Sequence, residues 1–189
     1  MLKRITLITL LAKYSSMGSL FSYFDGSLQD FLTYIKEIRD NSLVKVRLAQ
    51  VTQEALTVLS QSMVDTSFFH VLDNFAVNHI VSKHTNEKEE LRGQAILQDS
   101  DFLLIPYIVS NYDSLLIETV KNKKTVSYKK VCYNYVYFYV EEIRKGRHEL
   151  AGVTFYKRKK KLTDAKSPVD SADSGFASFS KKKLTGAKS

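Results

Sequence analysis

Two histidines, His79 and His84, lie five residues apart in a chain that contains only four histidines. An acidic stretch follows them along the chain, and then Arg92 and Gly93. Imidazole, carboxylate and guanidinium groups so close in sequence are able to bind a metal ion or to transfer protons. They are also ordinary at the solvated end of a helix. The spacing of the two histidines helps to distinguish a metal site, an acid–base pair and a solvated helix end.

The five-residue spacing disfavours a metal site. Two histidines that bind zinc from one helix are usually four residues apart, because that spacing places both on one face. Five residues correspond to a rotation of about 140° on a helix with 3.6 residues per turn. The only cysteine, Cys132, lies far along the sequence. We therefore expect neither a metal ion nor another cofactor.

The same spacing suits an acid–base pair if a helix carries His79 and ends before His84, which then lies in the following loop. RNA cleavage by the substrate's own 2′-hydroxyl needs a base, an acid and a cation that stabilises the phosphorane. His79 and His84, in either order, and Arg92 match these three roles. A solvated helix end without catalytic function is the alternative.

The first part of the chain predicts mainly helices. Apolar and basic residues alternate over residues 43–51, which predicts a short strand between two of these helices. Pro106 predicts a break near Ile105 in the last helix. The apolar run near the N-terminus is too short for a secretory signal, so we expect an amphipathic first helix instead. Capping residues and apolar residues at helical spacing place the helices at residues 5–20, 28–38, 73–84 and 99–111, and after Thr52.

The sequence changes character after Asn111. Four segments rich in Tyr, Val, Thr and Phe predict an antiparallel meander. Helices followed by strands indicate an α+β fold, with the N-terminal helices packed on a four-stranded antiparallel sheet. The four predicted strands are residues 114–120, 125–133, 135–144 and 148–157.

The net charge of +8 is concentrated at the C-terminus. Residues 157–189 contain ten Lys or Arg and three Asp, whereas the rest of the chain holds 18 Lys or Arg against 17 Asp or Glu. A nearly identical basic motif occurs at residues 159–167 and 181–189. We expect a helical region over residues 1–70, a main domain over 71–158 and a disordered basic tail over 159–189. Such a tail binds phosphates non-specifically or only aids solubility.

Several function classes lack their motifs. The sequence has no G-x-S-x-G, no G-x-x-x-x-G-K-[ST] and no G-x-G-x-x-G, so serine hydrolases, P-loop enzymes and Rossmann enzymes find no support. A single cysteine excludes an internal disulfide and fits a reducing compartment. No apolar run approaches the ~20 residues of a membrane span. We expect a cytoplasmic protein without membrane contact, with secretion or delivery in a virion as the lesser alternative.

An ordered set of motifs runs over residues 70–158. It consists of His79-Ile80, His84, Glu89-Glu90, Arg92-Gly93-Gln94, Asp99 to Asp101, Ile105-Pro106, Tyr139 to Gly146, Leu150, and Thr154 with Tyr156-Lys157. This order resembles the phage-associated branch of the barnase–EndoU–colicin–RelE-like nucleases. One departure from the family pattern is Thr85, which stands where the family commonly has glycine.

The resemblance implies an RNase-like fold, metal-independent RNA cleavage, and carriage by a phage, prophage or mobile element. If the chain is such a ribonuclease, His79 and His84 are the candidates for acid and base, in either order. Arg92 and Lys157 are candidates to stabilise phosphate or transition-state charge, and Thr154 is a candidate to hydrogen-bond the phosphate.

Tyr137 and Tyr139 are candidates for base stacking, although packing within the sheet is the favoured interpretation. RNA is the expected partner, with tRNA as one candidate, and an immunity or antitoxin protein is a candidate second partner. The alternative function is a non-catalytic nucleic-acid-binding or virion-associated interaction module.

Overall fold

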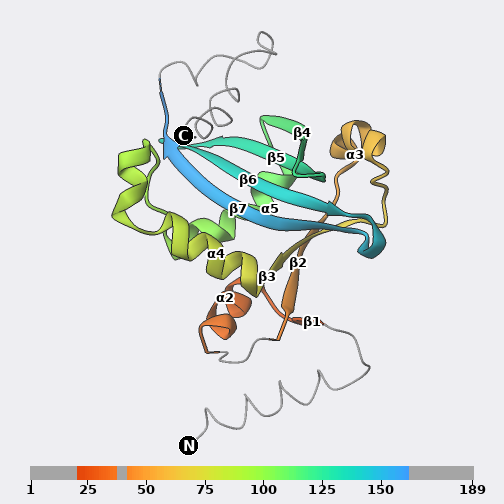
Figure 1. Cartoon of the computed structure of the whole chain (residues 1–189), viewed down its shortest axis with the longest axis horizontal. Helices are drawn as coiled ribbons and strands as arrows, with labels where there is room; N and C mark the ends of the chain where they lie inside the picture. The colour runs from red at the N-terminus through yellow and green to blue at the C-terminus, as the bar shows by residue number, and fades with distance from the viewer. Residues whose placement is uncertain (1–20, 38–41, 162–189) are drawn as a thin grey trace, which may run out of the picture.

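The computed structural model describes residues 21–37 and 42–161 (Figure 1). The helix expected over residues 5–20 and most of the expected tail lie outside the described residues. The strands are β1 (Ser22–Tyr23), β2 (Val44–Gln50), β3 (Phe69–Asp73), β4 (Ser114–Val120), β5 (Lys123–Cys132), β6 (Tyr135–Arg144) and β7 (Glu149–Lys159). The α-helices are α2 (Leu28–Glu37), α3 (Gln53–Leu59), α4 (Asn74–His84) and α5 (Ile105–Ser110), and the 3-10 helices are η1 (Ser60–Ser62), η2 (Glu87–Arg92), η3 (Asp99–Leu104) and η4 (Lys145–Arg147).

The α+β class is confirmed, but the sheet is larger than expected. All seven strands form one sheet in the order β1-β2-β3-β7-β6-β5-β4. Strands β4 to β7 form the expected antiparallel meander. The prediction of four strands is corrected because β3 pairs in parallel with β7 and extends the sheet through β2 and β1. The sheet also runs across the domain boundary expected at residue 70, which lies inside β3.

Capping side chains begin two of the helices as their sequence predicts. The Thr52 hydroxyl accepts a hydrogen bond from the Ala55 amide at 3.2 Å, and the Asp73 carboxylate accepts one from the Ala76 amide at 2.7 Å. The expected break near Ile105 is also confirmed, because η3 ends at Leu104 and α5 begins at Ile105 with Pro106 in its first turn. In Figure 1, α4 lies alongside β7, past the end of β3, and α5 lies behind the sheet.

The two faces of the sheet differ in exposure. On β6 the side chains of Tyr137, Tyr139, Glu141 and Ile143 are buried, whereas the residues that follow each of them, from Phe138 to Arg144, are half-buried. We call these the core face and the open face. Tyr137 and Tyr139, at 5% and 0% exposure, therefore pack within the sheet. The open face consists of Phe138, Val140, Glu142 and Arg144 on β6, and of Thr154, Tyr156 and Arg158 on β7.

A β-bulge in β7 decides which side chains reach the open face. Gly152 pairs with Glu141 and Thr154 pairs with Val140, so Val153 is the extra residue. A bulge shifts the alternation of the strand by one residue. The shift turns Thr154 towards the open face and Phe155 into the core.

Gly152→Ala is expected to destabilise this bulge. A Cβ atom at Gly152 would overlap the Tyr139 hydroxyl and lie 2.9 Å from Leu72 Cδ1, within the closed core. Overpacking of this kind typically costs about 1–3 kcal/mol. Urea unfolding should show a lower midpoint with an unchanged slope.

The matched control is Gly146→Ala, because nothing lies within 4 Å of a Cβ atom there. Equal midpoints for the two variants would mean that the bulge has room for a side chain.

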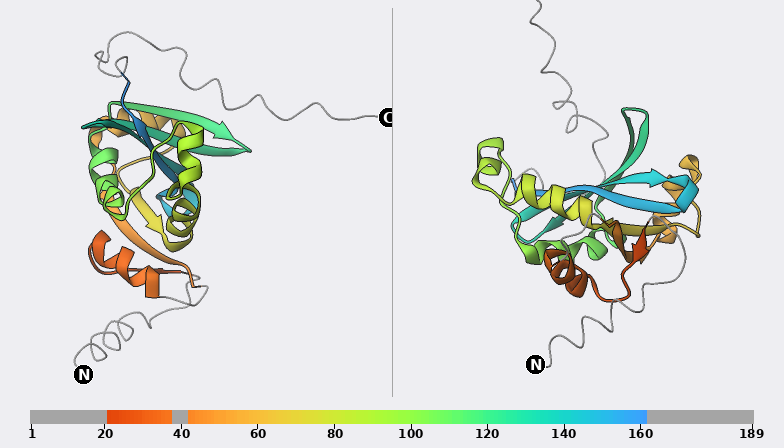
Figure 2. Two further views of the ribbon diagram at one scale, coloured as in Figure 1. Left: turned by 90° about the vertical axis from the view of Figure 1, so that its left-hand side faces the viewer. Right: turned by 60° about the horizontal axis from the view of Figure 1, so that its bottom comes forward.

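A fully buried ion pair joins β2 to β7. Lys45 Nζ lies 2.6 and 2.8 Å from the two carboxylate oxygens of Glu149, and the two side chains are 0% and 1% exposed. The Tyr23 hydroxyl donates to the same carboxylate at 2.7 Å. Burial and the neighbouring Glu149 carboxylate raise the pKa of Tyr23 to about 12. Figure 2 shows β1 beside β2, at the edge of the sheet farthest from β4.

Candidate active site

His84 is the last residue of α4 rather than a loop residue, which corrects the expected position of the helix end. Its backbone carbonyl accepts a hydrogen bond from the Leu97 amide at 2.9 Å. Thr85 follows with a φ of −109°, a conformation open to any residue, so a glycine is not required there. The Thr85 hydroxyl donates to the Val81 carbonyl at 2.6 Å. These bonds fix the backbone from which the His84 side chain projects.

A buried carboxylate orients the His84 ring. Glu89 Oε2 lies 2.7 Å from His84 Nδ1, and Arg92 NH1 donates to Glu89 Oε1 at 2.8 Å. Glu89 is 0% exposed, whereas Arg92 is 57% exposed. An ionised carboxylate only accepts hydrogen bonds, so the ring hydrogen resides on Nδ1 and Nε2 is left as an acceptor.

The other ring nitrogen faces the sheet. His84 Nε2 lies 3.1 Å from Thr154 Oγ1, and the hydroxyl donates to this nitrogen. The Tyr156 ring lies next to the imidazole, with ring centroids 5.9 Å apart. The His84 side chain is 13% exposed. A histidine held at both nitrogens and still reached by solvent is suited to act as a general base.

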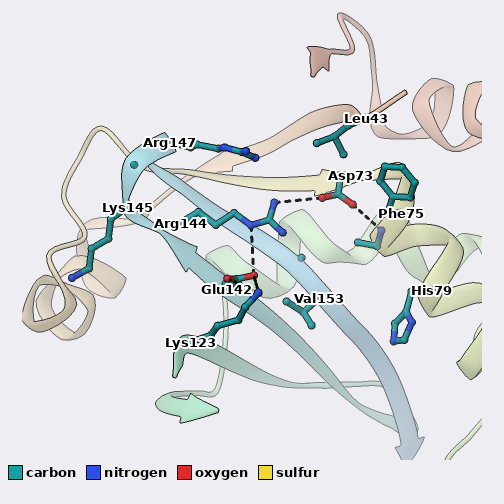
Figure 3. Close-up of a pocket in the computed structure, with 13 residues that line it drawn as sticks. Leu43, Asp73, Phe75, His79, Lys123, Glu142, Arg144, Lys145, Arg147 and Val153 are labelled. Atoms are coloured by element: carbon teal, nitrogen blue, oxygen red, sulfur yellow. Dashed lines mark hydrogen bonds and ion pairs between the residues drawn. The ribbon is translucent and has the colours of Figure 1, made fainter. Parts of the chain in front are cut away.

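His79 lies in a neighbouring cavity (Figure 3). It is exposed on α4, about 7.5 Å of helix rise before His84. Val153, the residue before Thr154, lines the same cavity. His79 is thus five residues before His84 on the same helix and about 140° around its axis, and Val153 directly precedes Thr154 on β7.

Lys157 lies on the core face, opposite to Thr154. Its Nζ is 2.7 Å from Asp101 Oδ2, and the Tyr137 hydroxyl donates to the other oxygen of Asp101 at 2.8 Å. Burial and this hydrogen bond raise the pKa of Tyr137. Of the five candidate residues, the structure thus joins His84 to Arg92 through Glu89 and to Thr154 through Nε2. It places His79 in the separate cavity and Lys157 on the core face.

The sequence analysis assigned no role to two features of this site. Glu89 is one of three acidic residues in η2, and its burial distinguishes it from the exposed Glu87 and Glu90. Next to the site, the rings of Phe138 and Tyr156 stack with centroids 4.9 Å apart and planes 11° apart. The only signal for this stack is the pairing of two aromatic residues on the same face of adjacent strands.

The described parts of the chain contain neither a cluster of metal-binding side chains nor a membrane-spanning helix. Within residues 21–37 and 42–161, no three His, Cys, Asp or Glu side chains are grouped closely enough to hold a metal ion. The helices described for this chain are also too short or too polar to cross a membrane.

Comparison with known proteins gives one match. The family described as phage-Barnase-EndoU-ColicinE5/D-RelE like nuclease3 matches residues 50–165, which is more than half of the chain. The match includes all the residues of the site and confirms the resemblance noted in the motifs. It leaves out β1, α2 and nearly all of β2. No curated protein and no solved structure matches the chain.

Proposed function

Because the chain belongs to the phage-Barnase-EndoU-ColicinE5/D-RelE like nuclease family, we propose that this nuclease of phage type cleaves RNA through attack by the substrate's 2′-hydroxyl. The observation that supports this proposal is the imidazole of His84, held between the buried Glu89 carboxylate and the Thr154 hydroxyl. The nucleophile comes from the substrate, so the protein has to supply only proton transfer and charge stabilisation.

In the first half of the proposed step, His84 Nε2 removes the proton of the 2′-hydroxyl while Glu89 stabilises the imidazolium. The 2′-oxygen forms a bond to phosphorus. Thr154, released from Nε2, donates its hydrogen bond to a phosphate oxygen. Arg92, whose guanidinium is more than half exposed beside Glu89, stabilises the added negative charge.

In the second half, the bond between phosphorus and the 5′-oxygen breaks. His79, in its protonated form, gives a proton to the leaving oxygen from the cavity that it lines. The products are a 2′,3′-cyclic phosphate and a free 5′-hydroxyl. Lys157 has no role in this scheme, because its ammonium group lies on the core face with Asp101.

We expect the purified chain to cleave a mixture of tRNA and rRNA in the presence of EDTA. The reaction as proposed uses no metal ion, and the 3′ ends of the products should carry a 2′,3′-cyclic phosphate. The rate should rise and then fall with pH, because the base must be neutral and the acid protonated. Mass spectrometry of the product ends and initial rates across a pH series provide the measurements.

Two results would contradict the proposal in different ways. Cleavage that EDTA abolishes would make the chain a metal-dependent nuclease. RNA binding that weakens steeply with salt but gives no products would make it a binding module.

A further inference from the structure

The cavity in Figure 3 is lined by several cationic side chains that have no role in the proposed reaction. Its volume is about 820 Å³. Four cationic side chains and His79 line it, against two carboxylates, so a negatively charged ligand is favoured there. The cations are Lys123, Arg144, Lys145 and Arg147, and the carboxylates are Asp73 and Glu142.

Arg144 lies at the centre of this cavity, between the two carboxylates. Its NH1 atom is 3.5 Å from Asp73 Oδ2, and its Nε atom is 3.6 Å from Glu142 Oε2. These distances are longer than those of good hydrogen bonds. The carboxylates thus orient the guanidinium, which is 27% exposed, and leave its N–H groups able to bind an incoming phosphate.

An aromatic surface lies next to these cations. Phe75, in the first turn of α4, lines the cavity and is 48% exposed. Cationic groups that follow a phosphate backbone, together with aromatic rings on which bases stack, are the usual features of proteins that bind single-stranded nucleic acid. A base within a duplex is already stacked and is not free to reach such a ring.

We propose that this cavity binds the nucleotide next to the cleaved bond of a single-stranded RNA. The phosphate of that nucleotide lies between Arg144 and Arg147, and its base stacks on Phe75. The position follows from His79 and Val153, which line the cavity and precede His84 and Thr154 along α4 and β7. This assignment rests on the proposed function, since it requires that RNA occupies the His84 site.

The test uses the full chain and uncleavable fluorescein-labelled 2′-O-methyl RNA of mixed sequence, two or eight nucleotides long. Lys145→Gln combined with Arg147→Gln changes two exposed residues, so the variant should fold. We expect it to bind the octanucleotide at least tenfold more weakly. The slope of log Kd against log salt should fall by about 1.4, or ~0.7 per lost cation. The ratio of the affinity for the octanucleotide to the affinity for the dinucleotide should fall by a similar factor.

Two further variants distinguish binding in the cavity from a general effect of net charge on RNA affinity. Phe75→Ala should weaken octanucleotide binding about tenfold, because the loss of one stacked base is of that order. Lys36→Gln combined with Lys130→Gln removes the same charge from two cations that lie outside the cavity and pair with Asp99 and Asp113. This control should bind like the unmodified chain.

Each remaining result decides one of the two proposals. Unchanged octanucleotide affinity in both cavity variants, or an equal loss in the lysine control, would overturn the cavity assignment. Failure of the unmodified chain to bind the octanucleotide would overturn it as well. If the chain binds RNA through the cavity but cleaves none, the result would support RNA binding in the cavity and contradict only the proposed cleavage.

Discussion

His84→Ala is expected to lower the turnover of RNA cleavage by about 10²–10⁴, the usual contribution of one acid–base group. The imidazole contacts both Glu89 and Thr154, and in the proposed reaction alanine would leave the 2′-hydroxyl without a base. Single-turnover rates on a labelled RNA measure the effect. The control is Lys83→Ala, which changes the preceding, exposed residue of α4. It should stay within about twofold of the unmodified rate, by the usual tolerance of exposed positions.

Glu89→Gln tests the orienting carboxylate separately. Glutamine keeps the shape of Glu89, but its amide nitrogen is able to donate to His84 Nδ1 and so favours the tautomer with the hydrogen on Nε2. Turnover should fall strongly. The turnover of the double variant, Glu89→Gln with His84→Ala, should be little lower than that of His84→Ala alone, since the two residues act on one proton transfer. Full additivity, or normal cleavage in His84→Ala, would show that another group is the base.

Lys45→Met is expected to lower the free energy of unfolding by about 3–5 kcal/mol, the cost of leaving one partner of a buried ion pair uncompensated. The Glu149 carboxylate would retain the Tyr23 hydroxyl and lose both contacts with the Lys45 ammonium. Urea unfolding measures the change. A matched control is Lys36→Met, because the Lys36–Asp99 pair is 62% and 70% exposed and contributes ~1 kcal/mol or less.

The double variant Lys45→Met with Glu149→Met should recover much of the lost stability, because it leaves no buried charge without its partner. If Lys45→Met unfolds at the same urea concentration as the unmodified chain, water compensates the carboxylate and the pair is not closed to solvent.

Local sequence signals predicted much of the fold. The caps at Thr52 and Asp73 and the break before Pro106 are decided by neighbouring residues, so their position could be inferred without the tertiary structure. The richness of residues 135–144 in Tyr, Val and Phe likewise predicted a strand with the bounds of β6. In contrast, β3 was missed, because four of its five residues are buried and the strand shows no alternation of apolar and polar residues.

The site was predicted less completely, for two physical reasons. Glu89 is acidic in an acidic stretch, and only the packing of η2 against His84 distinguishes it from its neighbours. Thr154 and Lys157 are three residues apart, and strand alternation places residues at an odd spacing on opposite faces. That rule separates the two residues from the sequence alone. The bulge at Val153, which decides which of them reaches His84, depends on the pairing with β6.

The position of β7 also determines when the candidate site is completed during synthesis. It is the last described strand to leave the ribosome, yet it lies fourth in the order of seven, between β3 and β6. Until β7 inserts, the two halves of the sheet have no common strand, and His84 has no Thr154. Such long-range pairing forms slowly and late. The chemistry proposed for His84 and Thr154 is therefore expected only after β7 has joined the sheet.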